Sequence, residues 1–261
     1  MKVLKWVPLL LMVVGIVAPL AAGGTFNRDL FMKFLDMRVG TGEPVYWYNV
    51  GEVYSSPDGK LLMRIEGCDM ARRVKPADQP DTYLQLSRKT YVYRDPTTNE
   101  ILQQWEGRPV PPIAYPYQYI VFKLVGDRME ITVEQGQGAN LRTIGPTEHM
   151  LARQIGDTAI FSSPLFINME TPQGHYEAYE NYDYILLPPK AGVEHRYQMT
   201  WNRYAAKPSF IGPGKVQMQM VGWRVDRFED LPATIRDYIR AEAPLYMAPP
   251  KDLNEIRALQ K

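Results

Sequence analysis

The fold is decided by an aromatic stretch, Val45-Tyr46-Trp47-Tyr48-Asn49-Val50-Gly51-Glu52-Val53-Tyr54. Successive side chains of an extended chain point to opposite faces, and β-branched and aromatic residues favour strands. The stretch ends at Ser56-Pro57-Asp58-Gly59, which predicts a turn because Pro presets φ at the second position and Gly accepts a positive φ. Residues 60–68 are therefore expected to return as the second strand of a hairpin.

Further strand-like runs follow, separated by turns. They cover residues 82–94, 100–105, 117–125, 129–135, 158–168, 175–187, 195–204 and 215–225. Residues 95–99 predict a turn, and the Pro-rich residues 109–116 predict a connection outside any central ladder, because Pro lacks the N–H donor. Residues 136–157 are rich in Gly at their start and predict no definite element.

Helices are expected only near the ends of the chain. Residues 26–37 carry apolar side chains at helical spacing. In the tail, Asp230 is expected to cap a helix that has Pro232 in its first turn, and Asp252 to start a last helix with Glu255 three residues on. The chain therefore predicts a mainly β protein: an antiparallel, closed or strongly bent, lipocalin-like barrel with short N-terminal and C-terminal helices.

The N-terminal residues predict export. Lys2 and Lys5 precede an apolar run at residues 6–22, and small residues follow it, as in a secretory signal. The run is short for a membrane span, but an uncleaved anchor is the alternative reading. We therefore expect residues 1–23 to be a signal peptide or anchor and residues 24–261 a single β-barrel domain. The protein would be periplasmic or envelope-associated, touching the membrane only through residues 6–22 if these stay attached.

Composition excludes several classes of protein. The 30 Lys and Arg balance 29 Asp and Glu, so no excess of positive charge is available to neutralise the phosphates of a nucleic acid. The 22 Pro disfavour a helical bundle. The single Cys68 permits no intramolecular disulfide, and a lone thiol of this kind usually behaves as a small buried hydrophobe.

Several ordered motifs resemble the DUF1838 proteins. They are Val45-Tyr46-Trp47-Tyr48 with Gly51 and Tyr54, Tyr91-Val92-Tyr93-Arg94-Asp95-Pro96-Thr97-Thr98 with Ile101-Leu102 and Trp105, and the tail residues Leu231-Pro232, Pro244, Tyr246, Ala248 and Pro249. The resemblance spans most of the chain after residue 23, and it implies a bacterial protein of a kind that often carries an export signal. It implies no activity, because the family is named for its unknown function.

Two segments depart from the family pattern. After Trp105 the family usually continues with Asn-Pro and a Thr-Gly turn, where this chain has Glu106-Gly107-Arg108-Pro109. The family's next strand often begins Asn-Asp-Pro, where this chain has Tyr115-Pro116-Tyr117-Gln118. An activity that used those Asn and Asp side chains would be lost or changed here, so the resemblance assigns no catalytic residue.

Metal and nucleotide sites are not indicated. His175, Glu177 and His195 form a conceivable two-His, one-carboxylate set, but ordinary His residues outnumber ligands and this spacing is common by chance. No Gly-x-Ser-x-Gly elbow occurs, and no plausible helix follows the Gly136-Gln137-Gly138 turn, as a phosphate loop would need. We expect no metal and no cofactor.

The aromatic strands indicate a ligand pocket. An eight- to ten-stranded barrel holds either packed side chains or one small ligand, and pockets for such ligands are mostly apolar and aromatic. The residues expected to line it are Trp47, Tyr93, Trp105, Tyr182, Tyr197, Trp201 and Met218. The same residues would fit an ordinary core. The preferred function is therefore binding of a small, largely apolar molecule inside the barrel.

Two other functions remain open. The first is a cofactor-independent enzyme of isomerase, hydratase or lyase type, for which the candidate groups are Asp95, Glu177, Asp183, His195 and Arg203. Asp95 also has a simpler role as the residue that caps the turn before Pro96. The second is a membrane-anchored envelope interaction protein whose barrel is filled by its own side chains.

Overall fold

The computed structural model describes residues 26–135, 150–171, 174–190 and 192–259. Residues 1–25, where a signal peptide or anchor is expected, lie outside this part, as does the Gly136-Gln137-Gly138 turn. Among the described residues, no helix is long and apolar enough to span a bilayer.

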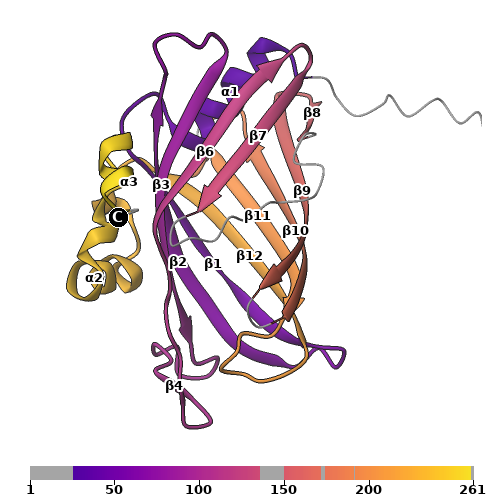
Figure 1. The fold of residues 1–261 in the computed structure, drawn as a ribbon, viewed down its shortest axis with the longest axis vertical. Coiled ribbons are helices and arrows are strands. Elements are labelled where there is room, and N and C mark those ends of the chain that lie inside the picture. Colours follow the sequence, from indigo (N-terminus) through magenta and orange to yellow (C-terminus); the bar gives the residue numbers. More distant parts are fainter. Residues whose placement is uncertain (1–25, 136–149, 172–173, 191, 260–261) are drawn as a thin grey trace, which may run out of the picture.

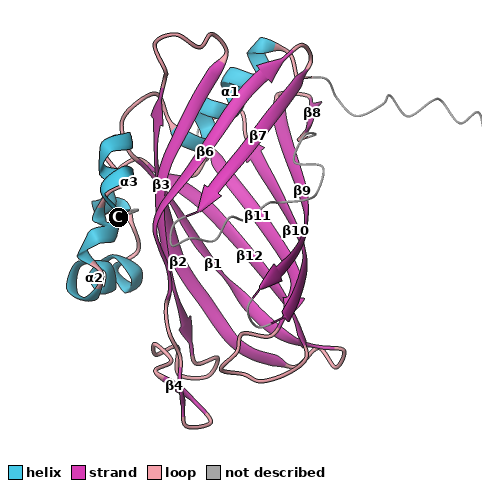
Figure 2. Ribbon diagram, viewed as in Figure 1, coloured by secondary structure: helices cyan, strands magenta, loops and turns pink. Residues whose placement is uncertain are grey.

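The described chain is built around one ten-stranded antiparallel sheet (Figures 1 and 2). Its strands are β1 (Val45–Ser56), β2 (Leu61–Val74), β3 (Thr82–Arg94), β6 (Ile113–Val125), β7 (Arg128–Gln135), β8 (Leu151–Ile155), β9 (Thr158–Thr171), β10 (Gly174–Leu186), β11 (Tyr197–Ala206) and β12 (Lys215–Val225). The order across the sheet is β7-β6-β3-β2-β1-β12-β11-β10-β9-β8, so the first strand pairs with the last. A separate small hairpin joins β4 (Gln104–Trp105) and β5 (Arg108–Pro109).

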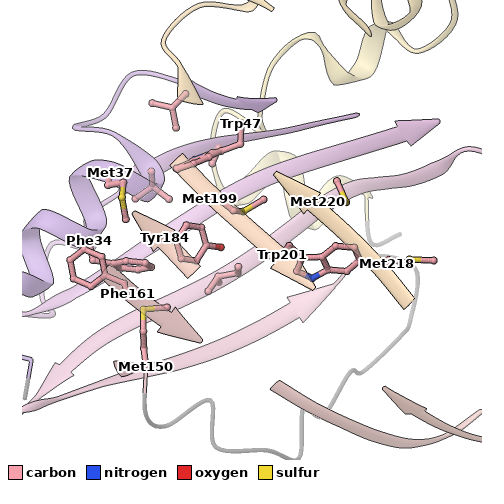
Figure 3. Packing of buried hydrophobic residues seen from close by; sticks show 14 of the residues in the cluster. Phe34, Met37, Trp47, Met150, Phe161, Tyr184, Met199, Trp201, Met218 and Met220 are labelled. Atoms are coloured by element: carbon pink, nitrogen blue, oxygen red, sulfur yellow. The ribbon is translucent and has the colours of Figure 1, made fainter. Parts of the chain in front are cut away.

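The sheet is strongly curled into a half-barrel, and helix α1 (Arg28–Val39) lies in its concavity (Figure 1). The ring of Phe34 lies 5.5 Å from that of Phe122 in β6 and 5.5 Å from that of Phe161 in β9, which are near opposite edges of the sheet. One helix can touch both edges only from inside the curl. Figure 3 shows Phe34 and Phe161 packed beside Met37 in this core.

Both ends of α1 are held by specific hydrogen bonds. The Asn27 side chain accepts from the backbone N–H of Leu30, as an N-cap does. At the other end, Arg224 donates to the carbonyls of Asp36 and Met37, and the indole of Trp47 donates to the carbonyl of Arg38 at 2.9 Å. These bonds satisfy carbonyls that a helix end leaves without an intrahelical partner.

The C-terminal helices cover the convex face over β1, β2 and β3 (Figure 1). They are η1 (Phe228–Asp230), α2 (Ala233–Glu242), η2 (Pro244–Met247) and α3 (Leu253–Leu259). Ile235 and Ile239 of α2 are fully buried in a cluster with Tyr46 and Tyr48, the side chains of β1 that alternate with the inward-pointing Trp47. The sheet segment from β1 to β3 is therefore covered on both faces.

Most of the expected elements are confirmed. The sheet is mainly β, antiparallel and strongly bent, with short helices at both ends of the described chain. The strands at 82–94 and 215–225 have the expected bounds, and the expected helix at 26–37 is found at Arg28–Val39. At Asp252 the side chain accepts from the backbone N–H groups of Asn254 and Glu255, which confirms the expected helix start.

Three local expectations were wrong. The run at 100–105 forms a strand only at Gln104–Trp105, beyond a single bridge between Arg94 and Ile101. Asp230 does not cap α2: it lies in η1 and pairs with Arg227.

The third concerns the Pro-rich residues 109–116, which were expected to lie outside the ladder. In the structure β6 begins at Ile113 and includes Pro116, and β6 is the second strand from the edge of the sheet. The register of β3 with β6 shifts between Ser87 and Lys89, at the level of Pro116. A strand tolerates Pro at such an irregularity. The carbonyl of Pro116 accepts a hydrogen bond from Arg88 Nε at 2.8 Å.

Candidate functional site on the concave face

The residues expected to line a pocket all belong to one cluster on the concave face. Trp47, Tyr93, Trp201 and Met218 are buried members of it, and Trp105, Tyr182 and Tyr197 are partly buried and pack against it. Figure 3 shows Trp47, Trp201 and Met218 in the same group of side chains, with Met199 and Met220 between them. Trp105 belongs to the separate β4–β5 hairpin and packs against the cluster from there.

Strand register places a charged pair among these aromatic residues. Tyr182 of β10 lies opposite Trp201 of β11, and one step along the same face Glu180 lies opposite Arg203. Met218 of β12 lies opposite Arg203 on the other side. An ion pair thus interrupts a wall made otherwise of Trp, Tyr and Met.

Glu180 is the centre of this group. The residue is only 6% exposed. Its Oε2 accepts hydrogen bonds from the Tyr182 hydroxyl at 3.1 Å and from the Trp201 indole N–H at 3.2 Å, and its Oε1 lies 3.3 Å from Arg203 Nε. A buried carboxylate is costly unless it is paired and hydrogen-bonded, and Glu180 is both. Its two hydrogen bonds both go to Oε2, and Oε1 faces Arg203.

Arg203 is less fully engaged than Glu180. It donates from Nη2 to the Tyr176 hydroxyl. Its Nε is near Glu180 but not oriented for a hydrogen bond, so this buried N–H has no acceptor among the described residues. Desolvation acts to lower the pKa of Arg203, but the Glu180 charge and nearby tyrosines outweigh it and raise that pKa, so the guanidinium stays cationic. Its side chain keeps 27% of its surface exposed although it points into the curl.

Four tyrosines surround this guanidinium. Tyr176 and Tyr182 come from β10, Tyr115 comes from β6, and Tyr93 comes from β3; the charge of Arg203 acts on each of them. Burial raises the pKa of Tyr93 to about 12 and that of Tyr182 well above 10. Both phenols therefore stay protonated at neutral pH and serve as hydrogen-bond donors. We call Glu180, Arg203, Trp201 and these four tyrosines the tyrosine–arginine site.

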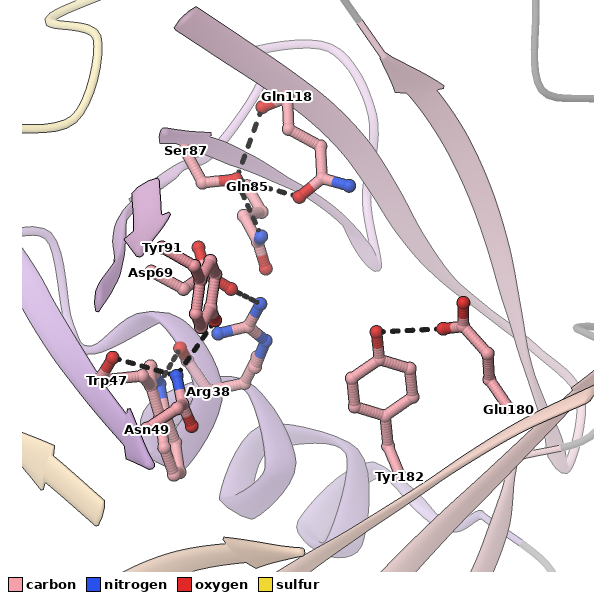
Figure 4. A network of polar contacts seen from close by, with 10 residues as sticks. All are labelled: Arg38, Trp47, Asn49, Asp69, Gln85, Ser87, Tyr91, Gln118, Glu180 and Tyr182. Atoms are coloured by element: carbon pink, nitrogen blue, oxygen red, sulfur yellow. Dashed lines mark hydrogen bonds and ion pairs between the residues drawn. The ribbon is translucent and has the colours of Figure 1, made fainter. Parts of the chain in front are cut away.

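A second polar group lies between α1 and the sheet (Figure 4). Arg38 of α1 forms a buried ion pair with Asp69 of β2, with Nη2 and Oδ2 2.6 Å apart. Desolvation acts to lower the pKa of Arg38, but the Asp69 charge and Tyr184 outweigh it, so the pKa is raised and the pair stays charged. The Gln85 amide donates to Ser87 Oγ at 2.9 Å nearby. This group fixes the helix to the sheet.

Most of the predicted catalytic groups lie away from the tyrosine–arginine site, which contains Arg203 alone of the five. Asp95 Oδ1 accepts from the backbone N–H groups of Thr97 and Thr98, both at 2.8 Å, and these bonds lower its pKa. Asp95 therefore has the simpler of its two predicted roles and caps the turn before Pro96. His195 lies before β11 and stacks on Trp223, with ring centroids 5.0 Å apart.

Asp183 and Glu177 alternate with the inward-pointing Tyr182 and so face the convex side. Asp183 accepts hydrogen bonds from Ser162 Oγ and Asn181 Nδ2, and Glu177 is exposed beside His175. His175, Glu177 and His195 are not brought together: within the described part of the chain, no three His, Cys, Asp or Glu residues are grouped to hold a metal ion. Cys68 is buried, and burial raises the pKa of its thiol.

Sequence reasoning missed Glu180, Tyr176 and Tyr115 as site residues. The alternation already placed Tyr176 and Glu180 on the face of Tyr182. A Glu in a strand resembles a solvated surface residue until the register shows Arg203 opposite to it. Tyr115 was missed because residues 109–116 were expected to be a connection.

Comparison with known proteins gives a family. Residues 42–259 match the model of a family described as "Protein of unknown function (DUF1838)". No curated protein matches the chain.

Proposed function

We propose, for a chain that belongs to the DUF1838 family and so inherits no known activity, that the concave face of its sheet binds a small, largely apolar ligand. The observation that carries the proposal is the tyrosine–arginine site. Arg203 points into the curl among aromatic and Met side chains, and it is neither fully covered nor fully hydrogen-bonded. Ligand sites typically combine a mostly apolar lining with a few polar groups that orient the ligand.

A core filled by the protein's own side chains accounts less well for these residues. Tyr115, Tyr176 and Tyr182 keep accessible surface although they face inward, whereas a closely packed core would bury them. An ion pair buried among apolar side chains rarely adds stability over a well-packed apolar substitute. A role in holding a ligand explains why Glu180 and Arg203 stand where apolar residues would pack.

Native mass spectrometry of the protein purified from its own cells, followed by denaturing extraction, tests this function. We expect a small apolar molecule to be released in stoichiometric amount. Trp201→Phe should retain less of it, whereas Tyr204→Phe, on the exposed convex face of the same strand, should retain as much as the unaltered protein. If the protein is empty and binds no apolar probe, the proposal is wrong.

An acid–base enzyme is the second candidate, and one observation favours it. The buried carboxylate of Glu180 accepts a hydrogen bond from a tyrosine hydroxyl inside an apolar surround, an arrangement that suits proton transfer. Incubating the extracted molecule with the protein would reveal turnover. Glu180→Gln should then abolish the reaction and keep binding; loss of both together would favour the binding role alone.

Export of the protein is also proposed, on the strength of Lys2, Lys5 and the apolar residues 6–22. The intact mass of the protein recovered from the periplasmic or envelope fraction tests it. A mass lacking about the first two dozen residues would support a cleaved signal, and a full-length protein in the membrane fraction would support the anchor. Recovery from the cytoplasm alone would contradict export.

A further inference from the structure

The charges that face into the curl are not balanced. Glu180 is paired with Arg203, and Asp69 with Arg38. Lys89 of β3 has no carboxylate within ion-pair distance among the described residues. It lies on the concave face, opposite Asp69 in β2 and Tyr115 in β6, and its ammonium lies 4.6 Å from the centroid of the Tyr115 ring. One positive charge is therefore left over beside the tyrosine–arginine site.

Around Arg203 the unsatisfied hydrogen-bonding groups are donors, whereas the unsatisfied acceptors Asn49 Oδ1, Asp69 Oδ1 and Gln85 Oε1 lie towards the ion pair of Arg38 and Asp69. Tyr93 and Tyr115 have no hydrogen-bond acceptor among the described residues, and Tyr176 accepts from Arg203, which leaves its own proton to donate. Glu180 Oε2 already accepts from Tyr182 and Trp201, and Oε1 is ion-paired with Arg203 without a hydrogen bond from its Nε. A ligand that enters the tyrosine–arginine site meets donors and a cation, and the two carboxylates of the described concave strands, Glu180 and Asp69, are each ion-paired with an arginine.

We infer that the ligand of the tyrosine–arginine site is an amphipathic carboxylic acid, bound as its carboxylate with the apolar body against the Trp and Met wall. The inference rests on the proposed function and names the ligand class. A carboxylate can accept hydrogen bonds from several of these donors, and its negative charge would balance that of Lys89. Hydrogen bonds to a charged acceptor are stronger than those to a neutral one. A cationic ligand would meet like charge, and a neutral one would leave Lys89 without a counter-charge.

A series of molecules that share the same alkyl chain and differ in the polar headgroup tests the inference. Dodecanoate, methyl dodecanoate, dodecanol and dodecylamine are titrated into the full-length protein, with displacement of a neutral fluorescent dye as the readout. We expect dodecanoate to bind at least about tenfold more tightly than the others, because hydrogen bonds to a charged acceptor are stronger than those to a neutral one.

Lys89→Met should remove most of this preference for the carboxylate. The matched control is Lys215→Met, since Lys215 also lies over a tyrosine ring, at 5.2 Å from Tyr204, but on the exposed convex side. It should leave the preference unchanged. Arg203→Met is less decisive alone, because it leaves Glu180 unpaired, so it is measured together with Arg203→Met/Glu180→Gln.

The outcomes separate the two proposals. If no member of the series binds, the binding function itself is overturned. If all heads bind equally, or the ester or alcohol binds best, the function stands and the carboxylate inference is overturned. If dodecanoate is preferred but Lys89→Met keeps that preference as Lys215→Met does, the carboxylate does not bind beside Lys89. The inference is then equally wrong.

Discussion

The amide of Asn49 in β1 donates a hydrogen bond of 3.0 Å to the hydroxyl of Tyr91 in β3, across the strand that lies between them. The bond is possible because the intervening residue in β2 is Gly67, where the Tyr91 ring occupies the space that a Cβ would take. On its other side, Asn49 lies against Gly222 of β12. Two glycines therefore let two polar side chains lie along the concave face.

Gly222→Ala should destabilise the protein. A Cβ at this position would stand 2.1 Å from Asn49 Oδ1 and 2.6 Å from the backbone oxygen of Tyr48, and the second of these cannot move without its strand. Overpacking of this kind typically costs about 1–3 kcal/mol, which urea denaturation would measure. Val221→Ala, at the exposed neighbouring position, is the control and should change the unfolding free energy little. Equal effects of the two variants would contradict the prediction.

Glu66 joins the sheet to α2, and its removal should be costly. Its carboxylate pairs with Arg94 Nε at 2.5 Å and accepts from Thr234 Oγ1 at 2.6 Å, with both charged residues buried. Removing one partner of a buried pair leaves the other charge uncompensated and costs about 3–5 kcal/mol. Glu66→Leu should lose about this amount in urea denaturation, and Glu66→Leu/Arg94→Met should recover part of it. A double variant as unstable as the sum of the single ones would show that the pair is not coupled.

Stability should fall in alkaline solution through Tyr93. Burial raises its pKa to about 12, whereas an unfolded tyrosine ionises near pH 10, so the folded state holds the proton more tightly. This contribution is complete below about pH 10 and is lost as the pH rises towards 12. Between pH 8 and pH 11, the free energy of unfolding should fall by about 1 kcal/mol less in Tyr93→Phe than in the unaltered protein. Tyr204→Phe is the exposed control, and a loss reduced equally in both variants would refute the assignment to Tyr93.

Asp95 should matter for the turn and not for ligand binding. Its lowered pKa reflects two backbone N–H donors, so its contribution to stability is present above about pH 4 and is lost as the pH falls through the folded-state value. Asp95→Ala should lower the melting temperature at pH 7, while Asp95→Asn, whose amide oxygen can accept the same bonds, should lower it less. Loss of ligand retention in folded Asp95→Ala would contradict this structural role.

The periodicity of the sequence predicted the sheet well where runs are long and alternate without interruption. Thr82–Arg94 and Lys215–Val225 are of this kind, and the bounds of both strands were predicted correctly. The pattern failed at Pro116, because a register shift in the partner strand accommodates a residue that ordinary pairing excludes.

Of the charged residues in or beside the site, the sequence predicted Arg203 but not Glu180 or Lys89. Alternation along one strand gives the face of a residue, but the partners of Glu180 and Lys89 depend on register with neighbouring strands, which the sequence does not contain. Asp183 and Glu177 were chosen for their chemistry, and the same alternation that placed Tyr182 inward puts them on the convex side. Chemical type and facing direction have to be weighed together.

The cover of β1 to β3 by α2 and α3 has a consequence for how the chain is made. Tyr46 donates to the carbonyl of Met247, 201 positions later, so strands that leave the ribosome early lack their outer cover until synthesis is nearly complete. Contacts so distant in sequence form slowly, and folding can finish only after the tail has been released. We expect chains stalled before residue 228 to be cleaved rapidly by protease within residues 45–94, and full-length chains to resist it. Resistance of the stalled chains would show that the strands fold without their cover.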